Sequence, residues 1–199
     1  MLLGKGAAMI TIRAETKRDE VAREALLDEA LGAARFAKTA QRLRDDRLPA
    51  DRLAFVASAR GKLVGTVRLW NVSAGPGRPA LFLGPLAVTS RLRNQGVGSA
   101  LMRHALAAAT ARDHSAVLLV GDAPYYARFG FSAEKTAQLW LPGPYERDRL
   151  LACELKPGAL DGARGLIGAT GRSAPTPELR VTRLADDEIT LAARPARAS

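Results

Sequence analysis

The sequence predicts a mixed α/β fold of the α+β kind, in which a central, mixed but mostly antiparallel sheet is split at a β-bulge and flanked by helices. First, three strand-like runs follow one another across short connections, at 53–57, 63–70 and 81–88. Second, an alanine-rich helical pattern over 97–110 is followed by an apolar run at 116–120, typical of a buried parallel strand. Third, Gly84-Pro85 interrupts the third run. Because proline has no N–H for the strand ladder, this pair indicates a bulge that parts the strand from its neighbour.

The remaining elements follow from the same patterns. Residues 10–13 alternate as a first strand, and Thr16 with Asp19 is typical of a helix start. A second, shorter helix is expected at 37–44. The apolar runs at 139–142 and 150–155 predict a final antiparallel pair.

The 199 residues are enough for one well-buried domain, with some left over. The hydrophobic content of 47% indicates a folded, globular protein. We expect residues 1–8 to be a flexible leader, with Met9 as an alternative start, and residues 9–167 to form the folded domain. Residues 168–199 are expected to be a largely flexible extension, with a strand or helical turn within 181–191.

Charge and cysteine content limit the possible partners and cellular setting. The net charge of +10 favours polyanionic partners, such as nucleic acid, a membrane surface or a phosphate-bearing cofactor. The arginines are scattered, however, which is typical of a solvated surface. The single cysteine, Cys153, excludes an internal disulfide framework and a cysteine-based zinc site. With no signal-peptide pattern and no membrane-length apolar run, we expect a cytoplasmic protein.

The strongest functional signal is the loop Arg93-Asn94-Gln95-Gly96-Val97-Gly98, which lies between the third strand-like run and the alanine-rich helix. Gly96 and Gly98 have no Cβ, so the backbone can bring several N–H groups close to an anion. These groups open a helix, where unpaired donors and a partial positive charge stabilise phosphate. Arg91 and Arg93 add charged donors. The loop therefore predicts a pyrophosphate site.

The spacing of the loop decides between the known phosphate motifs. No Gly-Lys-Ser/Thr follows Gly98, as a Walker loop requires, and the third glycine of a Rossmann fingerprint would fall at Leu101. The loop instead resembles the Arg/Gln-x-x-Gly-x-Gly/Ala loop of the GNAT (Gcn5-related) N-acetyltransferases, which holds coenzyme A. A second GNAT signature, Tyr-x-x-x-Gly-Phe, is present from Tyr126 to Phe131. Over roughly 10–167 the chain resembles the uncharacterised YhbS-like branch of that family.

The resemblance implies an N-acetyltransferase that moves the acetyl group of acetyl-CoA to a primary amine of an unidentified acceptor, either a small molecule or a protein. It implies that the Leu86 N–H faces the thioester carbonyl and that Ala87 and Val88 pair with the pantetheine amides. Tyr126 would be the general acid that protonates the departing thiolate. The residues implied to hold coenzyme A are Leu86, Ala87, Val88, Arg93, Asn94, Gln95, Gly96, Val97, Gly98 and Ser99.

The general base is left open by the sequence. Many GNAT enzymes carry a glutamate on the bulged strand, but 81–88 contains no carboxylate. Asp122 is a candidate, although an aspartate before a short helix is more often a cap. Glu15 and Asp51 are weaker candidates.

Other reactive or aromatic side chains have ordinary structural explanations. His104 is expected on the outer face of its helix, and Cys153 in an apolar strand is expected to behave as a small hydrophobe. Trp70 and Trp140 either line the acceptor pocket or pack in the core. No Cys/His cluster suggests a metal, and no metal cofactor is expected.

Two alternative functions remain open at this point. One is a non-catalytic acyl-CoA-binding sensor, favoured by the missing strand carboxylate. The other is a basic RNA- or ribosome-associated protein that modifies a protein amine there. The acceptor is expected to meet residues 36–44 and 140–149, since loops and variable helices carry specificity. A homodimer is plausible, and no membrane partner is expected.

Overall fold

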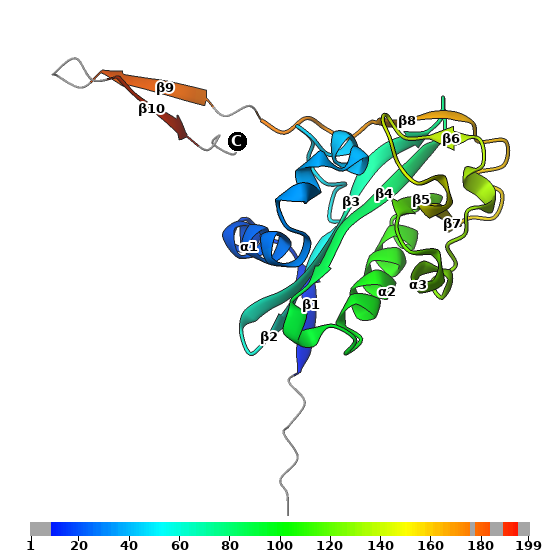
Figure 1. Ribbon diagram of the computed structural model, residues 1–199, viewed down its shortest axis with the longest axis horizontal. Coiled ribbons are helices and arrows are strands. Elements are labelled where there is room, and N and C mark those ends of the chain that lie inside the picture. The colour runs from blue at the N-terminus through cyan, green and yellow to red at the C-terminus, as the bar shows by residue number, and fades with distance from the viewer. Residues whose placement is uncertain (1–8, 176–177, 184–188, 195–199) are drawn as a thin grey trace, which may run out of the picture.

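An eight-stranded mixed sheet forms the centre of the computed structural model, which describes residues 9–175, 178–183 and 189–194 (Figure 1). The strand order is β1-β2-β3-β4-β5-β7, and β8 pairs with both β3 and β6. Among the described strands, β4 with β5 and β6 with β8 are parallel and the other pairs are antiparallel. The predicted meander followed by a parallel strand is confirmed. The bounds are β1 (Ile10–Ala14), β2 (Ala54–Ala59), β3 (Lys62–Ala74), β4 (Pro79–Val88), β5 (Ala116–Val120), β6 (Leu139–Trp140), β7 (Leu150–Glu154) and β8 (Gly165–Ala169).

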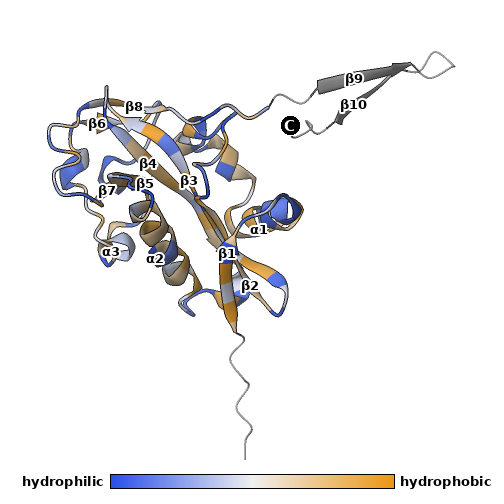
Figure 2. Ribbon diagram, turned by 180° about the vertical axis from the view of Figure 1, so that it is seen from behind, coloured by the Kyte–Doolittle hydropathy of each residue, from blue (hydrophilic) through white to orange (hydrophobic). Residues whose placement is uncertain are grey.

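Helices cover both faces of this sheet (Figure 1). The helices are α1 (Glu20–Leu31), α2 (Val97–Thr110) and α3 (Ala123–Ala127), with short 3-10 turns at η1 (Lys17–Asp19), η4 (Ser90–Leu92), η5 (Glu134–Thr136) and η6 (Arg147–Arg149). Side chains alternate along β4, so Leu86 and Val88 pack in the cluster that contains α2, while Ala87 packs under Leu26 and Leu27 of α1. Figure 2 shows the strands mostly hydrophobic and α1 mostly hydrophilic, so the core lies along the sheet.

The start of α1 follows the predicted cap. The backbone N–H and the hydroxyl of Thr16 both donate to Asp19 Oδ2 at 2.8 Å. Arg13 donates to both oxygens of the same carboxylate at 2.7 Å. These bonds, that from Arg13 first, hold the pKa of Asp19 far below its usual range. Two elements, β1 and α1, are thereby fixed to each other.

The prediction of a helix at 37–44 is confirmed only for 39–43, as a 3-10 helix, and is wrong in its bounds. The segment forms two 3-10 turns, η2 (Ala33–Ala37) and η3 (Thr39–Leu43), separated by an extended residue at Lys38. Tertiary contacts outweigh the local pattern here. The Thr39 hydroxyl donates to the Pro144 carbonyl, and the Arg42 guanidinium donates to the Pro142 carbonyl. These bonds hold η3 against the loop that precedes η6.

The predicted final antiparallel pair is also wrong. β7 pairs with β5, and β6 pairs in parallel with β8. The strand β6 ends at Trp140 because Pro142 and Pro144 follow within four residues and cannot donate to a ladder. The run at 150–155 instead completes the sheet beyond β5, where five residues of each strand are in register.

Contacts with the core continue past the predicted boundary at 167. The Leu48 N–H donates to the Arg172 carbonyl, and the Ala174 N–H donates to the Asp46 carbonyl, both at 2.8 Å. Farther on, β9 (Glu178–Arg183) and β10 (Ile189–Arg194) pair with each other as an antiparallel hairpin. The predicted leader at 1–8 lies outside the described residues.

Candidate active site

The predicted bulge is present in β4 at Gly84-Pro85. The antiparallel register pairs Leu69 with Leu83 but Val67 with Leu86, so β4 has one more residue than β3 at this point. Gly84 adopts a φ of 139°, a conformation that residues with a Cβ rarely adopt. The indole N–H of Trp70, which is buried, donates to the Gly84 carbonyl. Trp70 therefore holds the bulge and does not line a pocket.

The sheet divides just before the bulge. β4 and β5 are in parallel register only at Leu81 with Val117 and Phe82 with Leu118. Because the Thr89 N–H donates to the Val64 carbonyl at 2.9 Å, the alternation of an antiparallel ladder turns the Ala87 amide toward β3. The same alternation turns the amides of Leu86 and Val88 toward the open edge, where β5 no longer pairs. The split therefore presents two strand amides to a ligand.

The helix α2 opens beside this split with unpaired backbone donors. Gly96 precedes the helix with a φ of 82°, and within the described residues the amides of 96–99 have no acceptor. The loop is held from the other side by α1, since Glu29 accepts bonds from the Ser90 amide and hydroxyl, and Arg93 donates to the Ala30 carbonyl at 3.3 Å. Arg93, Asn94, Gln95 and Gly96 are exposed. The predicted pyrophosphate loop is thus open and rich in donors.

Two adjacent tyrosines of α3 lie between this loop and the sheet. The Tyr126 ring packs so closely on Gly121 that a Cβ added there would lie 2.1 Å from a ring carbon. Burial raises the pKa of Tyr126 to about 12. The Tyr125 hydroxyl lies near the start of α2, where a Cβ added to Gly98 would meet it at 3.1 Å. Tyr125 was not among the predicted site residues, although it stands next to the second signature.

A cavity of about 640 Å³ extends from the bulge across both tyrosines. Its floor is β4 from Phe82 to Leu86, and its far wall comes from 37–41, Arg44 and 144–146. The two segments predicted to meet the acceptor are therefore brought together, although Phe36 and Trp140 do not line the cavity. The exposed Trp140 instead packs under the Arg147 guanidinium.

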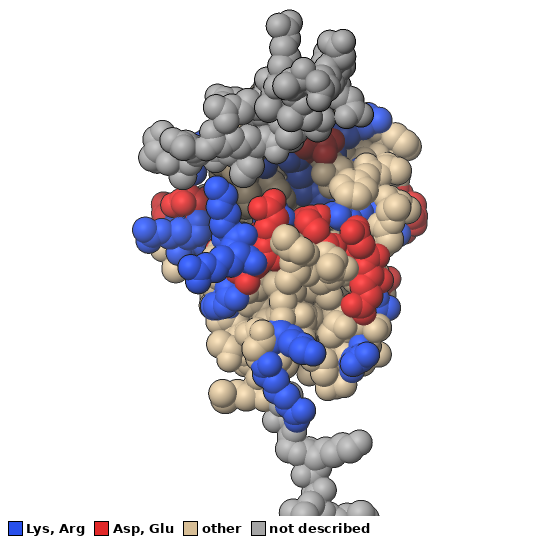
Figure 3. Space-filling view, turned by 90° about the vertical axis from the view of Figure 1, so that its left-hand side faces the viewer, with Lys and Arg blue, Asp and Glu red and all other residues tan. Residues whose placement is uncertain are grey.

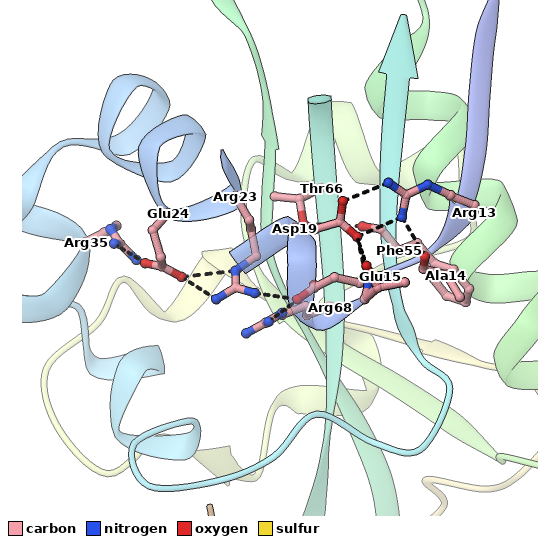
Figure 4. A network of polar contacts seen from close by, with 11 residues as sticks. Arg13, Ala14, Glu15, Asp19, Arg23, Glu24, Arg35, Phe55, Thr66 and Arg68 are labelled. Atoms are coloured by element: carbon pink, nitrogen blue, oxygen red, sulfur yellow. Dashed lines mark hydrogen bonds and ion pairs between the residues drawn. The ribbon is translucent and has the colours of Figure 1, made fainter. Parts of the chain in front are cut away.

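Two carboxylates line the cavity, those of Asp122 and Glu146. Asp122 stands at the N-cap position of α3, but its side chain makes no capping bond. Glu146 is paired with Arg149 at 3.1 Å and was not anticipated from the sequence. Of the weaker base candidates, Glu15 is buried between Arg23 and Arg68 (Figure 4). Asp51 is exposed in a turn.

The remaining singled-out side chains lie away from the cavity. His104 is exposed on α2 and contacts the Phe55 ring edge-on, with centroids 4.6 Å apart. Cys153 is half-buried in β7, and burial raises the pKa of its thiol. In the described part of the chain, no group of three or more His, Cys, Asp or Glu side chains is placed to hold a metal ion. No described helix is long and apolar enough to cross a membrane.

A strand that parts from its parallel neighbour beside a helix with free N-terminal amides is an arrangement suited to an acyl-CoA-dependent transferase. Sequence comparison agrees, because the model of the acetyltransferase (GNAT) family matches residues 19–131, more than half of the chain. The chain belongs to the GNAT acetyltransferase family. Its fold is the GNAT fold, and its chemistry is acyl transfer.

Individual relatives support the same assignment. The chain is 29% identical over 158 residues to the uncharacterized N-acetyltransferase YhbS of Escherichia coli K12, which covers 78% of this chain and 93% of that protein. It is similar to a crystal structure of E. coli YhbS in complex with CoA, with a TM-score of 0.71 and 27% identity over 84% of this chain and 93% of the other. A Brucella melitensis GNAT acetyltransferase solved with acetyl-CoA shares the fold, with a TM-score of 0.54 and 24% identity over 78% of this chain and 100% of the other.

Proposed function

We propose that this protein transfers the acetyl group of acetyl-CoA directly to a primary amine of an acceptor that enters the cavity under η3. The observation that carries the proposal is the split between β4 and β5, which opens beside four free amides of α2 and continues into the cavity. A pyrophosphate at 96–99 and a pantetheine arm along the open edge of β4 would bring a thioester to the bulge. The amides of Leu86 and Val88 support this path. The Ala87 amide is turned toward β3 and away from this path, which argues against the predicted pairing of Ala87 with a pantetheine amide.

The reaction needs an oxyanion donor, an acid and a route for the proton of the amine. A neutral amine attacks the thioester carbonyl, a C–N bond forms, the C–S bond breaks, and coenzyme A leaves as a thiolate. The Leu86 N–H is the proposed donor to the tetrahedral oxyanion, and such donors typically contribute on the order of 3 kcal/mol. Tyr126 is the proposed acid for the thiolate. Asp122, which lines the cavity without capping α3, is the proposed acceptor of the amine proton.

The first test is a calorimetric titration of acetyl-CoA. We expect micromolar binding to the natural protein and at least tenfold weaker binding to a Gly96→Glu variant, because a carboxylate there would occupy the phosphate site. Gly77→Glu is the matched control, since Gly77 also has a positive φ, of 71°, and open space around it, but lies in the loop between β3 and β4. Absence of binding to the natural protein would overturn the proposal. Equal losses in both variants would indicate backbone strain and not loss of the phosphate site.

Tyr126→Phe tests the acid. The ring would keep its contact with Gly121, so stability should change little while kcat falls by about 10²- to 10⁴-fold. Because burial raises the pKa of Tyr126 to about 12, its phenol stays protonated through the working range. The rate should therefore not decline up to about pH 10 on account of this group. An unchanged kcat in the Phe variant would remove Tyr126 from the mechanism.

The two alternative functions make different predictions in the same experiments. A sensor would bind acetyl-CoA but release no thiol with any amine. An RNA-associated protein would be retained on polyanions with a steep salt dependence. Figure 3 shows the face that carries α1 with basic and acidic side chains interspersed, and this face is not uniformly positive. Acetyl transfer is therefore the function that the site supports best.

A further inference from the structure

The acceptor half of the cavity contains an unusual arginine. Arg44 follows η3 and lines the cavity, and its side chain is largely buried. The side chain makes no hydrogen bond or ion pair with any described residue, and its Nε is fully buried without a partner. Buried guanidinium groups without partners are costly, because the group loses its hydration and gains nothing in return. Such a group calls for a ligand.

None of the other charged side chains that line the cavity forms an ion pair with Arg44. Arg35 is occupied by Glu24 and Asp28, and Arg149 is paired with Glu146. Lys38 is exposed and makes no ion pair within the described residues. Asp122 makes no ion pair with Arg44. Asp45, the next residue in the chain, acts on Arg44 only through its charge, so the cavity contains one largely buried guanidinium that no described carboxylate pairs with directly.

The position of Arg44 relative to the bulge limits the size of the ligand. A Cβ added to Gly84 would lie 3.7 Å from Arg44 Nη1, so the guanidinium reaches the bulge itself. Leu86, the proposed oxyanion donor, stands only two residues farther along β4. A ligand group bound by Arg44 would thus lie only a few bonds from an amine that attacks a thioester at Leu86.

From this geometry we propose that the acceptor is a compact amine that carries an oxyanion a few bonds from its nitrogen, as an amino acid does, and that Arg44 binds this oxyanion. The inference rests on the proposed acetyl transfer. A planar guanidinium fork matches a carboxylate, and matches a phosphate equally well, so the shared chemistry is the oxyanion. Burial lowers the pKa of Arg44 to about 10, which leaves it charged at neutral pH. Arg44 is thus a specificity residue for the acceptor.

The experiment compares each acid with its neutral counterpart. The probes are alanine, phenylalanine and β-alanine, each against its amide, and O-phosphoethanolamine against ethanolamine, with thiol release as the readout. An amide lowers the pKa of the neighbouring amine, so at neutral pH more of the amide than of the acid is in the neutral, attacking form. A preference for the acid at this pH therefore indicates recognition. We expect kcat/KM to favour the acid by about 10- to 150-fold, the worth of one hydrogen bond to a charged group. A preference among the amino acids indicates a carboxylate, and one for phosphoethanolamine alone indicates a phosphate.

Variants assign the preference to Arg44. Arg44→Met should reduce the ratio of kcat/KM for the acid to kcat/KM for its neutral counterpart to nearly one. Arg44→Lys should restore part of this preference. Arg112→Met is the matched control: Arg112 is exposed beyond the end of α2, where its guanidinium donates to the Ala108 carbonyl, and its loss changes the net charge equally. Equal use of acids and neutral amines by the natural protein would overturn the proposal, as would an Arg44→Met variant that keeps the preference.

Two further measurements separate this proposal from the proposed function. If acetyl-CoA binds but no probe is turned over, the melting temperature of the acetyl-CoA complex is measured with each probe pair. The acids should raise this melting temperature in the natural protein and not in Arg44→Met. Equal shifts in the two proteins would overturn the proposal. The affinity for acetyl-CoA should be the same within twofold in Arg44→Met. A large loss would mean that the guanidinium serves the cofactor, and the proposal would then be wrong.

Discussion

Arg23 and Arg44 are both arginines with little exposure, yet their surroundings are opposite. Arg23 in α1 donates to Glu15 and to Glu24, and Glu15 in turn accepts bonds from Arg68 of β3 (Figure 4). Arg44 has no such partner within the described residues. Since desolvating a guanidinium costs several kcal/mol unless hydrogen bonds offset it, one arginine is satisfied by the fold and the other is not.

The ion-pair cluster of Glu15, Arg23, Glu24 and Arg68 stabilises the strands around the bulge. Glu15 follows β1, and its N–H donates to the Ala54 carbonyl at 2.9 Å, so the carboxylate is fixed by the sheet. Arg68 stands on β3 where the register with β4 shifts, and its guanidinium lies 5.8 Å from the ring of Trp70, which holds the Gly84 carbonyl. The cluster therefore connects β1, α1 and β3 behind the bulge. Arg44 approaches the same bulge from the cavity, where a bound ligand would satisfy it.

The largest expected effect comes from Glu15→Gln. This change leaves Arg23 and Arg68 buried beside an uncharged amide, and breaking a buried pair in this way typically costs about 3–5 kcal/mol of unfolding free energy. Chemical denaturation measures it. Glu134→Gln is the control, because Glu134 is exposed and makes no ion pair among the described residues, and its loss should cost less than about 0.5 kcal/mol. Equal costs in the two variants would mean that the cluster is solvated.

Arg44→Met should act in the opposite direction. Removing an unsatisfied buried donor and its charge is expected to raise the unfolding free energy by about 1 kcal/mol. The sign follows from proton binding. Burial lowers the pKa of Arg44 to about 10, below its value in the unfolded chain, so the unfolded chain binds this proton more tightly. The cost is fully present below about pH 10 and fades as the pH rises through that value. The gain from Met should therefore be complete at pH 7 to 8. A loss of stability at pH 7 would show that Arg44 supports the fold.

The difference between the two arginines also marks what the sequence can predict. The bulge was predictable because proline lacks an N–H, and the free amides at 96–99 because Gly96 directly precedes a helix. Tyr126 was singled out by its signature, and its role as the acid stays a prediction. All three are local patterns whose physical cause lies within a few residues of chain.

Features that depend on distant segments were not predictable in this way. Arg44 begins the charged run Arg44-Asp45-Asp46-Arg47, which has the composition of a solvated turn. Its burial results from η3 docking on the loop at 142–144, about a hundred residues away. The pairing of β6 with β8 was missed for the same reason, since two residues of strand carry too little pattern to specify a partner.

The smallest effect is expected at the exposed ion pair of Asp51 and Arg52. Asp51 and Arg52 form an exposed pair at 4.0 Å, with side chains 83% and 78% exposed. Water already solvates both charges, so Asp51→Asn should change the unfolding free energy by less than about 0.5 kcal/mol. Asp51 lies outside the cavity, so kcat/KM should also stay within twofold, as measured by thiol release at 0.05 and 0.5 M salt. A clear loss of activity would make Asp51 a base candidate again, whereas a loss of stability that disappears at high salt would show that even exposed charges hold this basic protein together.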